Sequence, residues 1–312
     1  IMPNYQGVWS LSEQYQNASG WPLPLSNFKA AFGGGNAGGN VIDYILIPST
    51  GNAQDWGDLT SSRQQVAACG NEIRGVWIGG SNSEVMDYIT WASQGNAVDF
   101  GNVDSPTNQY DRGAGCGNST RGIFGGGEFE GAGVTNTIQY ITFSTTGNAI
   151  DFGDRTIADP EIAALSSTTR AVFLGGDSNN VIDYVTISST GNAIDFGDLV
   201  YAQYAMGGCS SPTRGVIGAG QTGGSGNINK TYYITIASTG NATEFGTLSG
   251  HGLGTAAASS KTRGVFAGGN SNETNKISYI TTASLGDGTD FGDLTVARNY
   301  LAGASNCNGG LS

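Results

Sequence analysis

One unit of sequence occurs six times in this chain of 312 residues, and this repetition limits the possible folds more than any other feature. The clearest copy, NAIDFGDRT at residues 148–156, returns as NAIDFGDLV at 192–200, and the other four copies are looser. Each copy places an aromatic residue directly after an acidic residue and directly before a glycine. The aromatic residues lie 44 to 52 positions apart and are Trp56, Phe100, Phe152, Phe196, Phe245 and Phe291. A repeat of this period indicates a solenoid, a propeller or an array.

Each unit carries four short runs rich in β-forming residues. A run of small residues, as in YAMGGCSS, lies just ahead of a segment like RGVFGGG. A segment like VIDYITI follows, and the aromatic segment ends the unit. Clusters of Gly, Asn and Ser separate the runs and favour tight turns, among them STGNA before the aromatic segment. Four strands in a unit of this length match the size of a propeller blade, whereas the unit is about twice as long as one coil of a solenoid. We therefore expect an all-β chain that forms a six-bladed β-propeller.

The two ends of the repeat predict how such a ring closes. The first unit begins at Lys29 without a run of small residues ahead of it, whereas NYLAGASN at 299–306 follows the last aromatic segment. If this spare C-terminal strand completes the first blade, the ring has no free sheet edge. We assign residues 1–28 to a lead-in segment, in which Trp9 and Trp21 are expected to pack as core residues, and 29–312 to the propeller.

Charged residues also repeat. Every unit has a basic residue at the start of its second strand and an acidic residue before its aromatic residue, at strand ends that we expect on one face. Catalysis by a group repeated six times is improbable, whereas half-buried charges need partners, so we interpret the two sets as structural ion pairs. The basic residues are Lys29, Arg74, Arg121, Arg170, Arg214 and Arg263, and the acids are Asp55, Asp99, Asp151, Asp195, Glu244 and Asp290.

The loops divide into two classes that alternate along the chain. Those joining strands 1 to 2 and 3 to 4 are near copies of one another, and we call their side of the ring the uniform face. Those joining strands 2 to 3 and each strand 4 to the next blade differ in length and sequence, and they define the variable face. Variable loops on a fixed scaffold usually hold binding sites, although such a face can also merely tolerate insertions. The candidate binding residues there are Tyr110, Glu128, Phe129, Glu130, Gln221, Asn227, Lys230 and His251.

Composition argues against several functions. A net charge of −12 with 13 basic residues does not suit a nucleic-acid surface. The sequence has neither a run of 18 apolar residues nor the features of a signal peptide, so we expect no membrane insertion. A single histidine, His251, gives no catalytic triad, and the one loop pair worth testing for glycoside hydrolysis is Glu128 with Glu130. We predict a protein that is not an enzyme.

The cysteines do not form a recognisable metal motif. Cys69, Cys116 and Cys209 each precede the arginine of their unit by five residues, while other units have Leu165 and Ala258 there. We therefore interpret these thiols as small core side chains. We expect no cofactor and no metal; Asp and Asn in the turns leave calcium as an alternative, but the EF-hand spacing is missing.

The combined unit TRGVFGGG…DYITI.STGNA.DFGDLT resembles the kelch-like glycine-rich repeats of virion proteins from marine bacteriophages, cyanophages among them. The resemblance covers about residues 29–306, and the lead-in at 3–16 resembles the segment that precedes such repeats in fibre or tail proteins. It implies a virion protein outside the cell, such as a tail fibre or related appendage, that assembles with other virion proteins and forms homo-oligomers. Two roles remain open: attachment to a host-surface glycan or protein through the variable loops, and a purely architectural role against neighbouring subunits.

Overall fold

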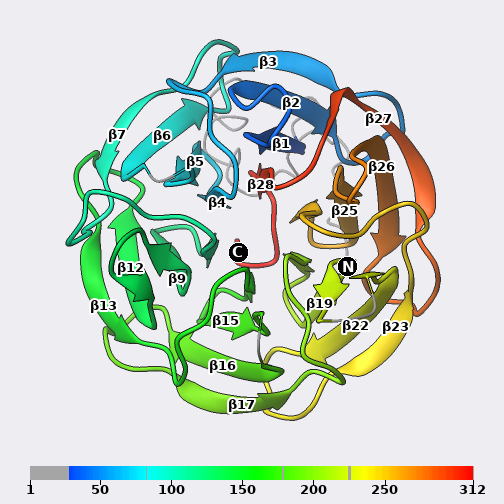
Figure 1. The fold of residues 1–312 in the computed structure, drawn as a ribbon. Coiled ribbons are helices and arrows are strands. Elements are labelled where there is room, and N and C mark those ends of the chain that lie inside the picture. The colour runs from blue at the N-terminus through cyan, green and yellow to red at the C-terminus, as the bar shows by residue number, and fades with distance from the viewer. Residues whose placement is uncertain (1–27, 82, 178, 224–225, 312) are drawn as a thin grey trace, which may run out of the picture.

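A computed structural model describes residues 28–311 apart from 82, 178 and 224–225. Six four-stranded antiparallel sheets surround a central axis (Figure 1), and two short hairpins extend from them. The described residues contain β-strands and no α-helix. The chain is thus a six-bladed β-propeller, as the repeat predicts. The lead-in segment, with Trp9 and Trp21, lies outside the described residues.

The strands of each blade follow in sequence from the inside of the ring to the outside, except in the first blade. Blade 1 consists of β28 (Ala302–Ser305), β1 (Lys29–Gly33), β2 (Val41–Leu46) and β3 (Gln54–Asp58), and blade 2 of β4 (Ala67–Gly70), β5 (Arg74–Ile78), β6 (Val85–Thr90) and β7 (Val98–Asn102). Blade 3 consists of β8 (Ala114–Gly117), β9 (Arg121–Gly125), β12 (Thr137–Thr142) and β13 (Ile150–Asp154), and blade 4 of β14 (Ala163–Ser166), β15 (Arg170–Leu174), β16 (Val181–Thr186) and β17 (Ile194–Asp198). Blade 5 consists of β18 (Gly207–Ser210), β19 (Arg214–Gly218), β22 (Lys230–Thr235) and β23 (Thr243–Thr247), and blade 6 of β24 (Ala256–Ser259), β25 (Arg263–Ala267), β26 (Thr274–Thr281) and β27 (Thr289–Arg298).

The C-terminal strand closes the ring. β28 pairs antiparallel with β1, with Ala30 opposite Ser305 and Gly33 opposite Ala302, so the last strand completes the first blade as predicted. The residues after it cross the axis, and Figure 1 shows the C-terminus at the centre of the ring. Asn308 Nδ2 donates to the Gly70 carbonyl at 3.1 Å, and the Gly309 amide donates to the Ser210 carbonyl at 3.1 Å. This tail therefore closes the channel at the uniform face.

The hydrophobic core lies between blades. It divides into six clusters, each shared by two neighbouring blades, because the middle strands are apolar on both sides. Large side chains of the second strands, such as Trp77 and Phe173, are completely buried there. The repeated tyrosine and the repeated aromatic residue of each blade meet edge to face, as in Tyr88 and Phe100, whose ring centroids are 5.7 Å apart.

The glycine after each aromatic residue permits close contact between blades. Gly153 has φ of 144°, and a Cβ there would lie 2.6 Å from the backbone of Gly191 in the next blade. The neighbouring turn is held by Asn192, whose Oδ1 accepts a 3.1 Å hydrogen bond from the Asp154 amide. The same amide contact recurs at all six junctions, with Asp287 in place of asparagine at one of them. The Asp-Phe-Gly and Gly-Asn pairs of the repeat are therefore the two halves of one junction.

The predicted ion pairs of the repeat are wrong. Each basic side chain instead donates to a backbone carbonyl of the next blade while it lies over an aromatic ring of its own blade: Arg170 Nη1 is 2.8 Å from the Ile236 carbonyl, and its guanidinium is 4.4 Å from the Tyr184 centroid. The acids expected as partners are exposed to solvent and need no counter-charge, and within the described ranges only Glu244 of that set forms an ion pair, with Lys230. The basic residues with such carbonyl contacts are Lys29, Arg74, Arg121, Arg170, Arg214 and Arg263. The solvated acids are Asp55, Asp99, Asp151, Asp195 and Asp290.

Buried ion pairs do occur, at a position that the sequence pattern presents as apolar. The third residue of the strand VIDYIT is a fully buried aspartate in three blades. Asp43 binds Arg298 at 2.9 Å, Asp183 binds Arg155 at 3.1 Å, and Asp87 binds Arg63. Arg63 and Arg155 come from the connections that enter the same blades, and Arg298 is the last residue of β27, where the connection to blade 1 begins, so these pairs hold the variable-face connections against the sheets.

Candidate ligand site at the mouth of the channel

The two faces differ in structure as they do in sequence. On the variable face, hairpin β10 (Glu128–Phe129) to β11 (Gly133–Val134) extends from blade 3, and hairpin β20 (Gln221–Thr222) to β21 (Gly226–Asn227) extends from blade 5. Each hairpin pairs with the connection that enters its blade, through bridges between Asp111 and Glu128 and between Tyr204 and Gln221. The variable face is therefore built as ordered structure on both sides of blade 4.

Three of the eight predicted binding residues lie in the core, so they cannot contact a ligand at this surface. Tyr110 is 2% exposed and packs against Phe124 and Phe129. Phe129 is 7% exposed and anchors hairpin β10–β11. His251 is 3% exposed, and its ring nitrogens bind the Gly268 carbonyl at 2.9 Å and the Ser278 hydroxyl at 3.0 Å. Aromatic and imidazole groups in variable loops can anchor those loops in the core as well as bind a ligand, and this explains why Tyr110, Phe129 and His251 were wrongly predicted to face a ligand.

The other five lie at the surface but do not converge on one place. Glu128 accepts a hydrogen bond from Arg112 Nη1 at 3.2 Å, while Glu130 is exposed in the turn of the same hairpin. Gln221 accepts from the Tyr204 hydroxyl at 2.7 Å. Asn227 connects its hairpin to blade 6 through Asn270, and Lys230 pairs with Glu244 at 2.7 Å. These residues shape the variable face, and their mutual placement does not form a single pocket.

The backbone brings six other residues together around the axis. Each lies two positions before the innermost strand of its blade, and each has a left-handed φ between 52° and 70°. The amide of each donates to the carbonyl of its counterpart in the preceding blade at 2.7 to 3.0 Å, so that six hydrogen bonds form a closed circle. We call this circle the mouth ring, and it consists of Gln65, Arg112, Glu161, Ala205, Gly254 and Tyr300.

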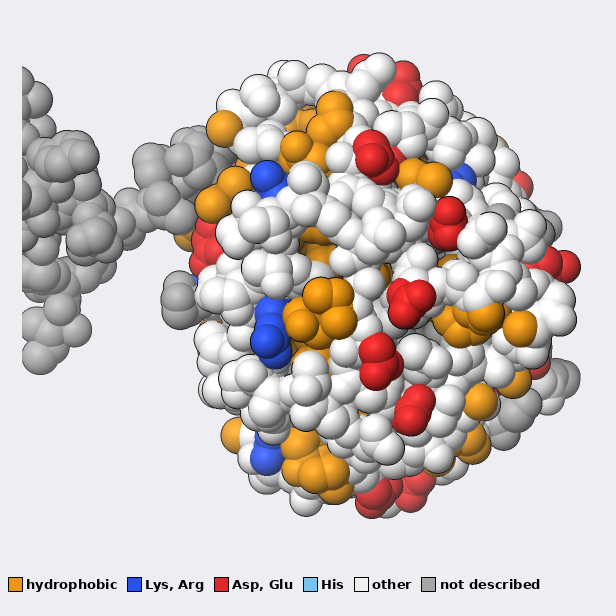
Figure 2. Space-filling view, turned by 90° about the vertical axis from the view of Figure 1, so that its left-hand side faces the viewer, with side chains coloured by type: hydrophobic (Ala, Val, Ile, Leu, Met, Phe, Trp, Pro, Cys, Tyr) orange, Lys and Arg blue, Asp and Glu red, His pale blue; other side chains and the backbone are white. Residues whose placement is uncertain are grey.

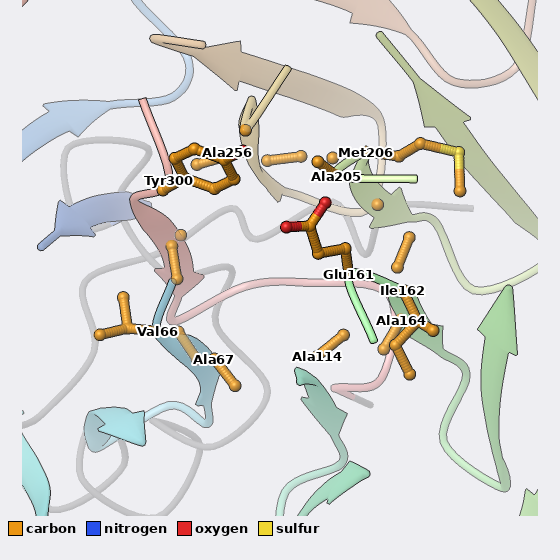
Figure 3. Close-up of a pocket in the computed structure, with 18 of the residues that line it drawn as sticks. Val66, Ala67, Ala114, Glu161, Ile162, Ala164, Ala205, Met206, Ala256 and Tyr300 are labelled. Atoms are coloured by element: carbon orange, nitrogen blue, oxygen red, sulfur yellow. The ribbon is translucent and has the colours of Figure 1, made fainter. Parts of the chain in front are cut away.

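Inside the mouth ring lies a cavity of about 110 Å³ that opens on the variable face (Figure 3). Its wall combines aliphatic side chains, among them Val66, Ile162 and Met206, with polar side chains of the mouth ring and exposed backbone. Below the wall the channel is narrow, because alternate blades place glycine where the others place alanine: a Cβ at Gly115 would lie 2.6 Å from the Ala68 carbonyl oxygen. The six residues at this level are Ala68, Gly115, Ala164, Gly208, Ala257 and Gly303. With the C-terminal tail at the far end, the cavity is a pocket with one entrance.

The side chains of the mouth ring differ although their backbones are alike. Figure 3 shows the Glu161 carboxylate directed into the cavity, with Tyr300 across the opening from it and the small Ala205 close by. The Glu161 side chain is 14% exposed, and its charged partner is Arg112, whose Nε lies 3.9 Å from Oε1. Arg112 is shared with Glu128. The mouth thus combines a largely desolvated carboxylate, a phenol and an amide above the aliphatic side chains of the cavity wall.

Electrostatics at the mouth is dominated by acids. Burial raises the pKa of Glu161 above its ordinary value; Arg112 opposes this rise, and Asp177, Asp111 and Asp159 add to it. Burial, with the Glu161 charge, raises the pKa of Tyr300 to about 12, so its phenol stays protonated at neutral pH. The potential at the opening therefore favours positive charge and hydrogen-bond donors.

The sequence contains a signal for the mouth ring that loop comparison overlooks. The ring residue follows the repeated aromatic residue by nine positions in five units and by twelve in the unit of Phe100. The residue type at this position differs in every unit, but it also differs at the position before it, which is Gln64, Asp111, Pro160, Tyr204, Leu253 and Asn299. The regular spacing from the aromatic residue therefore marks the ring position, whereas variation in residue type does not single it out.

All four cysteines are free and buried, and for Cys69, Cys116 and Cys209 this agrees with their interpretation as small core side chains. Burial raises the pKa of the Cys116 and Cys209 thiols to about 12. The described part of the chain brings together no group of three or more His, Cys, Asp or Glu residues able to hold a metal ion. It also contains no helix long and apolar enough to cross a membrane.

Fold and channel together define a six-bladed β-propeller with one open axial pocket. Among solved structures, the chain is similar to one described as "Structure of YjhT", with a TM-score of 0.65 and 9% identity over 79% of this chain and 88% of that one. At this identity the likeness concerns the fold alone. No family model and no curated protein matches the sequence. The absence of catalysis therefore stays a prediction.

Proposed function

We propose that this propeller is a recognition module of a phage particle that binds a host-surface glycan on its variable face. The proposal places the chain outside the cell, in a tail fibre or related appendage, among other virion proteins and in a homo-oligomer. Its virion setting rests on the resemblance of the repeat unit to bacteriophage proteins. Its binding role rests on the structure of the two faces.

The observation that carries the binding role is the break in symmetry at the variable face. Six near-identical loops and the tail form the uniform face, whereas the other face has two ordered hairpins and an axial pocket with six different ring residues. The axial pocket combines aliphatic side chains with a few convergent polar groups, as small-ligand sites commonly do. Phenol, amide and carboxylate groups suit the hydroxyl groups and the apolar face of a sugar.

A direct test is binding of the purified propeller to a glycan array and to host cells. We expect the wild-type protein to bind a restricted set of glycans. The Tyr300→Ala variant, which lacks the phenol at the mouth, should bind them with lower affinity. Arg74→Lys on the uniform face is the matched control and should bind as wild type. Failure of the wild-type protein to bind any glycan or host cell would refute the proposal.

An architectural role is the second candidate, and exposed aliphatic side chains favour it. Val98, Ile150 and Ile194 begin the outermost strands of blades 2, 3 and 4 and are 51%, 56% and 61% exposed, whereas the other three blades have Gln54, Thr243 and Thr289 there. Figure 2 shows separate hydrophobic patches beside basic side chains on this side of the ring. If subunits contact one another along this rim, a triple variant with threonine in place of Val98, Ile150 and Ile194 should fail to assemble and should still bind glycan.

A further inference from the structure

We infer that the mouth ring binds a single terminal sugar bearing a free, positively charged amino group, with the Glu161 carboxylate as the partner of the ammonium. This inference deepens the proposed glycan recognition and rests on it. It selects the axial pocket from the whole variable face, and it selects amino sugars from the wider class of glycans.

The geometry places the Glu161 carboxylate where a ligand group can reach it. Its side chain extends from the mouth ring into the cavity (Figure 3), is 14% exposed, and has Arg112 as its charged neighbour at 3.9 Å. That distance is longer than a direct charge-assisted hydrogen bond, and the same guanidinium donates to Glu128 at 3.2 Å. The carboxylate is therefore poorly solvated and only partly neutralised, and a ligand ammonium would supply both charge and donors.

Surrounding charges support a cation over a neutral or acidic group. Asp111, Asp159 and Asp177 are close enough to Glu161 to raise its pKa, and Arg112 is the cation that opposes them. A ligand carboxylate or phosphate would meet this negative field, whereas an ammonium would be attracted to it. Because the site is partly dehydrated, the interaction is stronger than an exposed pair would give.

The size and shape of the cavity indicate one sugar ring rather than a chain. The opening leads into a cavity of about 110 Å³ whose wall includes the aliphatic side chains of Val66, Ile162 and Met206, and alternating Ala and Gly residues narrow the channel below it. Tyr300 lies across the opening from Glu161 (Figure 3), and one arc of the mouth ring between these two residues consists of the small residues Ala205 and Gly254. A pyranose ring could thus enter at the small residues, with its apolar face toward the tyrosine and the rest of a glycan directed outward.

Two substitutions test the site while preserving the fold. Glu161→Gln removes the charge and keeps the shape, and Glu130→Gln makes the same change in an exposed hairpin turn outside the cavity. Ala205→Tyr fills the opening, and its backbone can accept a large side chain because Tyr300 occupies the equivalent position with φ of 56° against 52° for Ala205. Thermal denaturation checks that all three variants fold.

The measurement is titration of the full chain at pH 6.5 and low salt with D-glucosamine, N-acetyl-D-glucosamine, D-glucose and D-glucuronate. We expect glucosamine to bind at least tenfold more tightly than the other three sugars. Glu161→Gln and Ala205→Tyr should each weaken its binding tenfold or more, while Glu130→Gln has no effect. Affinity should fall as salt is raised.

The outcomes separate the two proposals. Glycan or host-cell binding without a preference for glucosamine, or with affinity unchanged in Glu161→Gln, overturns this inference and leaves the proposed function in place. A glucosamine preference that depends on Glu161, without any binding to glycans or cells, supports the site and refutes attachment. Absence of both kinds of binding refutes both.

Discussion

His251 should make the stability of the propeller depend on pH between 7 and 4. It is the single histidine of the chain, and burial lowers its pKa from 6.5 to about 4 while its ring stays bound to Gly268 and Ser278. Because the folded pKa lies below the unfolded one, the unfolded chain binds more protons between these values. The contribution of the neutral His251 ring to the free energy of unfolding is therefore complete above pH 6.5 and is lost as the pH falls toward 4.

The magnitude follows from the size of the shift. At 1.36 kcal/mol per pKa unit, a shift of this size gives a loss of about 2 kcal/mol between pH 7 and pH 5 and about 3 kcal/mol by pH 4. Carboxyl groups with raised pKa, such as Asp43 and Glu161, contribute with the opposite sign, so the comparison must be with a matched variant. His251→Gln is suitable, since Gln203 already donates to the corresponding carbonyl, Ala219, at 2.6 Å.

Urea denaturation of both proteins at several pH values measures the effect. The difference in unfolding free energy between wild type and His251→Gln should shrink by about 2 kcal/mol from pH 7 to pH 5. The Gln variant keeps every carboxyl group of the wild type, so their contributions cancel in this difference. Parallel pH profiles for the two proteins would show that His251 is not held neutral by the fold.

Three further changes test the junctions between blades. Arg170→Met removes a carbonyl hydrogen bond and a cation–π contact and should lower the free energy of unfolding by about 2 kcal/mol in a denaturant titration. Asp195→Asn should change it by less than about 0.5 kcal/mol. Equal losses for the two variants would restore the ion-pair interpretation. By the same assay, Gly153→Ala should lower the free energy of unfolding by more than about 2 kcal/mol, and clearly more than Gly191→Ala, whose Cβ would meet open space. Similar losses for the two variants would refute the close contact between blades at Gly153. Deletion of residues 302–312 leaves the inner edge of β1 unpaired and should abolish cooperative thermal unfolding by circular dichroism, while an unchanged transition would mean that the ring does not depend on its closing strand.

Much of the fold could be predicted because the sequence repeats it. Four runs per unit and a spare final strand sufficed for six blades and for closure through β28, since strand pairing within a blade follows chain order. The partners of the repeated arginines could not be predicted in the same way. A carbonyl such as that of Ile236 carries no mark in the sequence, whereas an acidic side chain does, and pattern reasoning therefore selected the acids.

The candidate site was only partly predictable for a related reason. Loop variability distinguished the two faces, but it did not separate residues that anchor a loop, such as Tyr110 and His251, from those that face solvent. Burial is decided by packing between blades, and chain position alone does not reveal it. The mouth ring escaped notice because its members are brought together by backbone hydrogen bonds, for which any residue type supplies the donor and acceptor.

The same backbone bonds explain why a symmetric ring can hold an asymmetric site. A side chain repeated in every blade produces six equivalent surfaces on the rim, and only near the axis do all six blades reach one ligand. At the mouth ring the structural task is done by amides and carbonyls, so the side chain at each position is free to differ without opening the circle. Tyr300 and Gly254 occupy equivalent positions with φ values of 56° and 70°, which shows how wide that freedom is. In the proposed site, single substitutions at the mouth would therefore change the specificity for a ligand while the contacts between blades that stabilise the propeller stay the same.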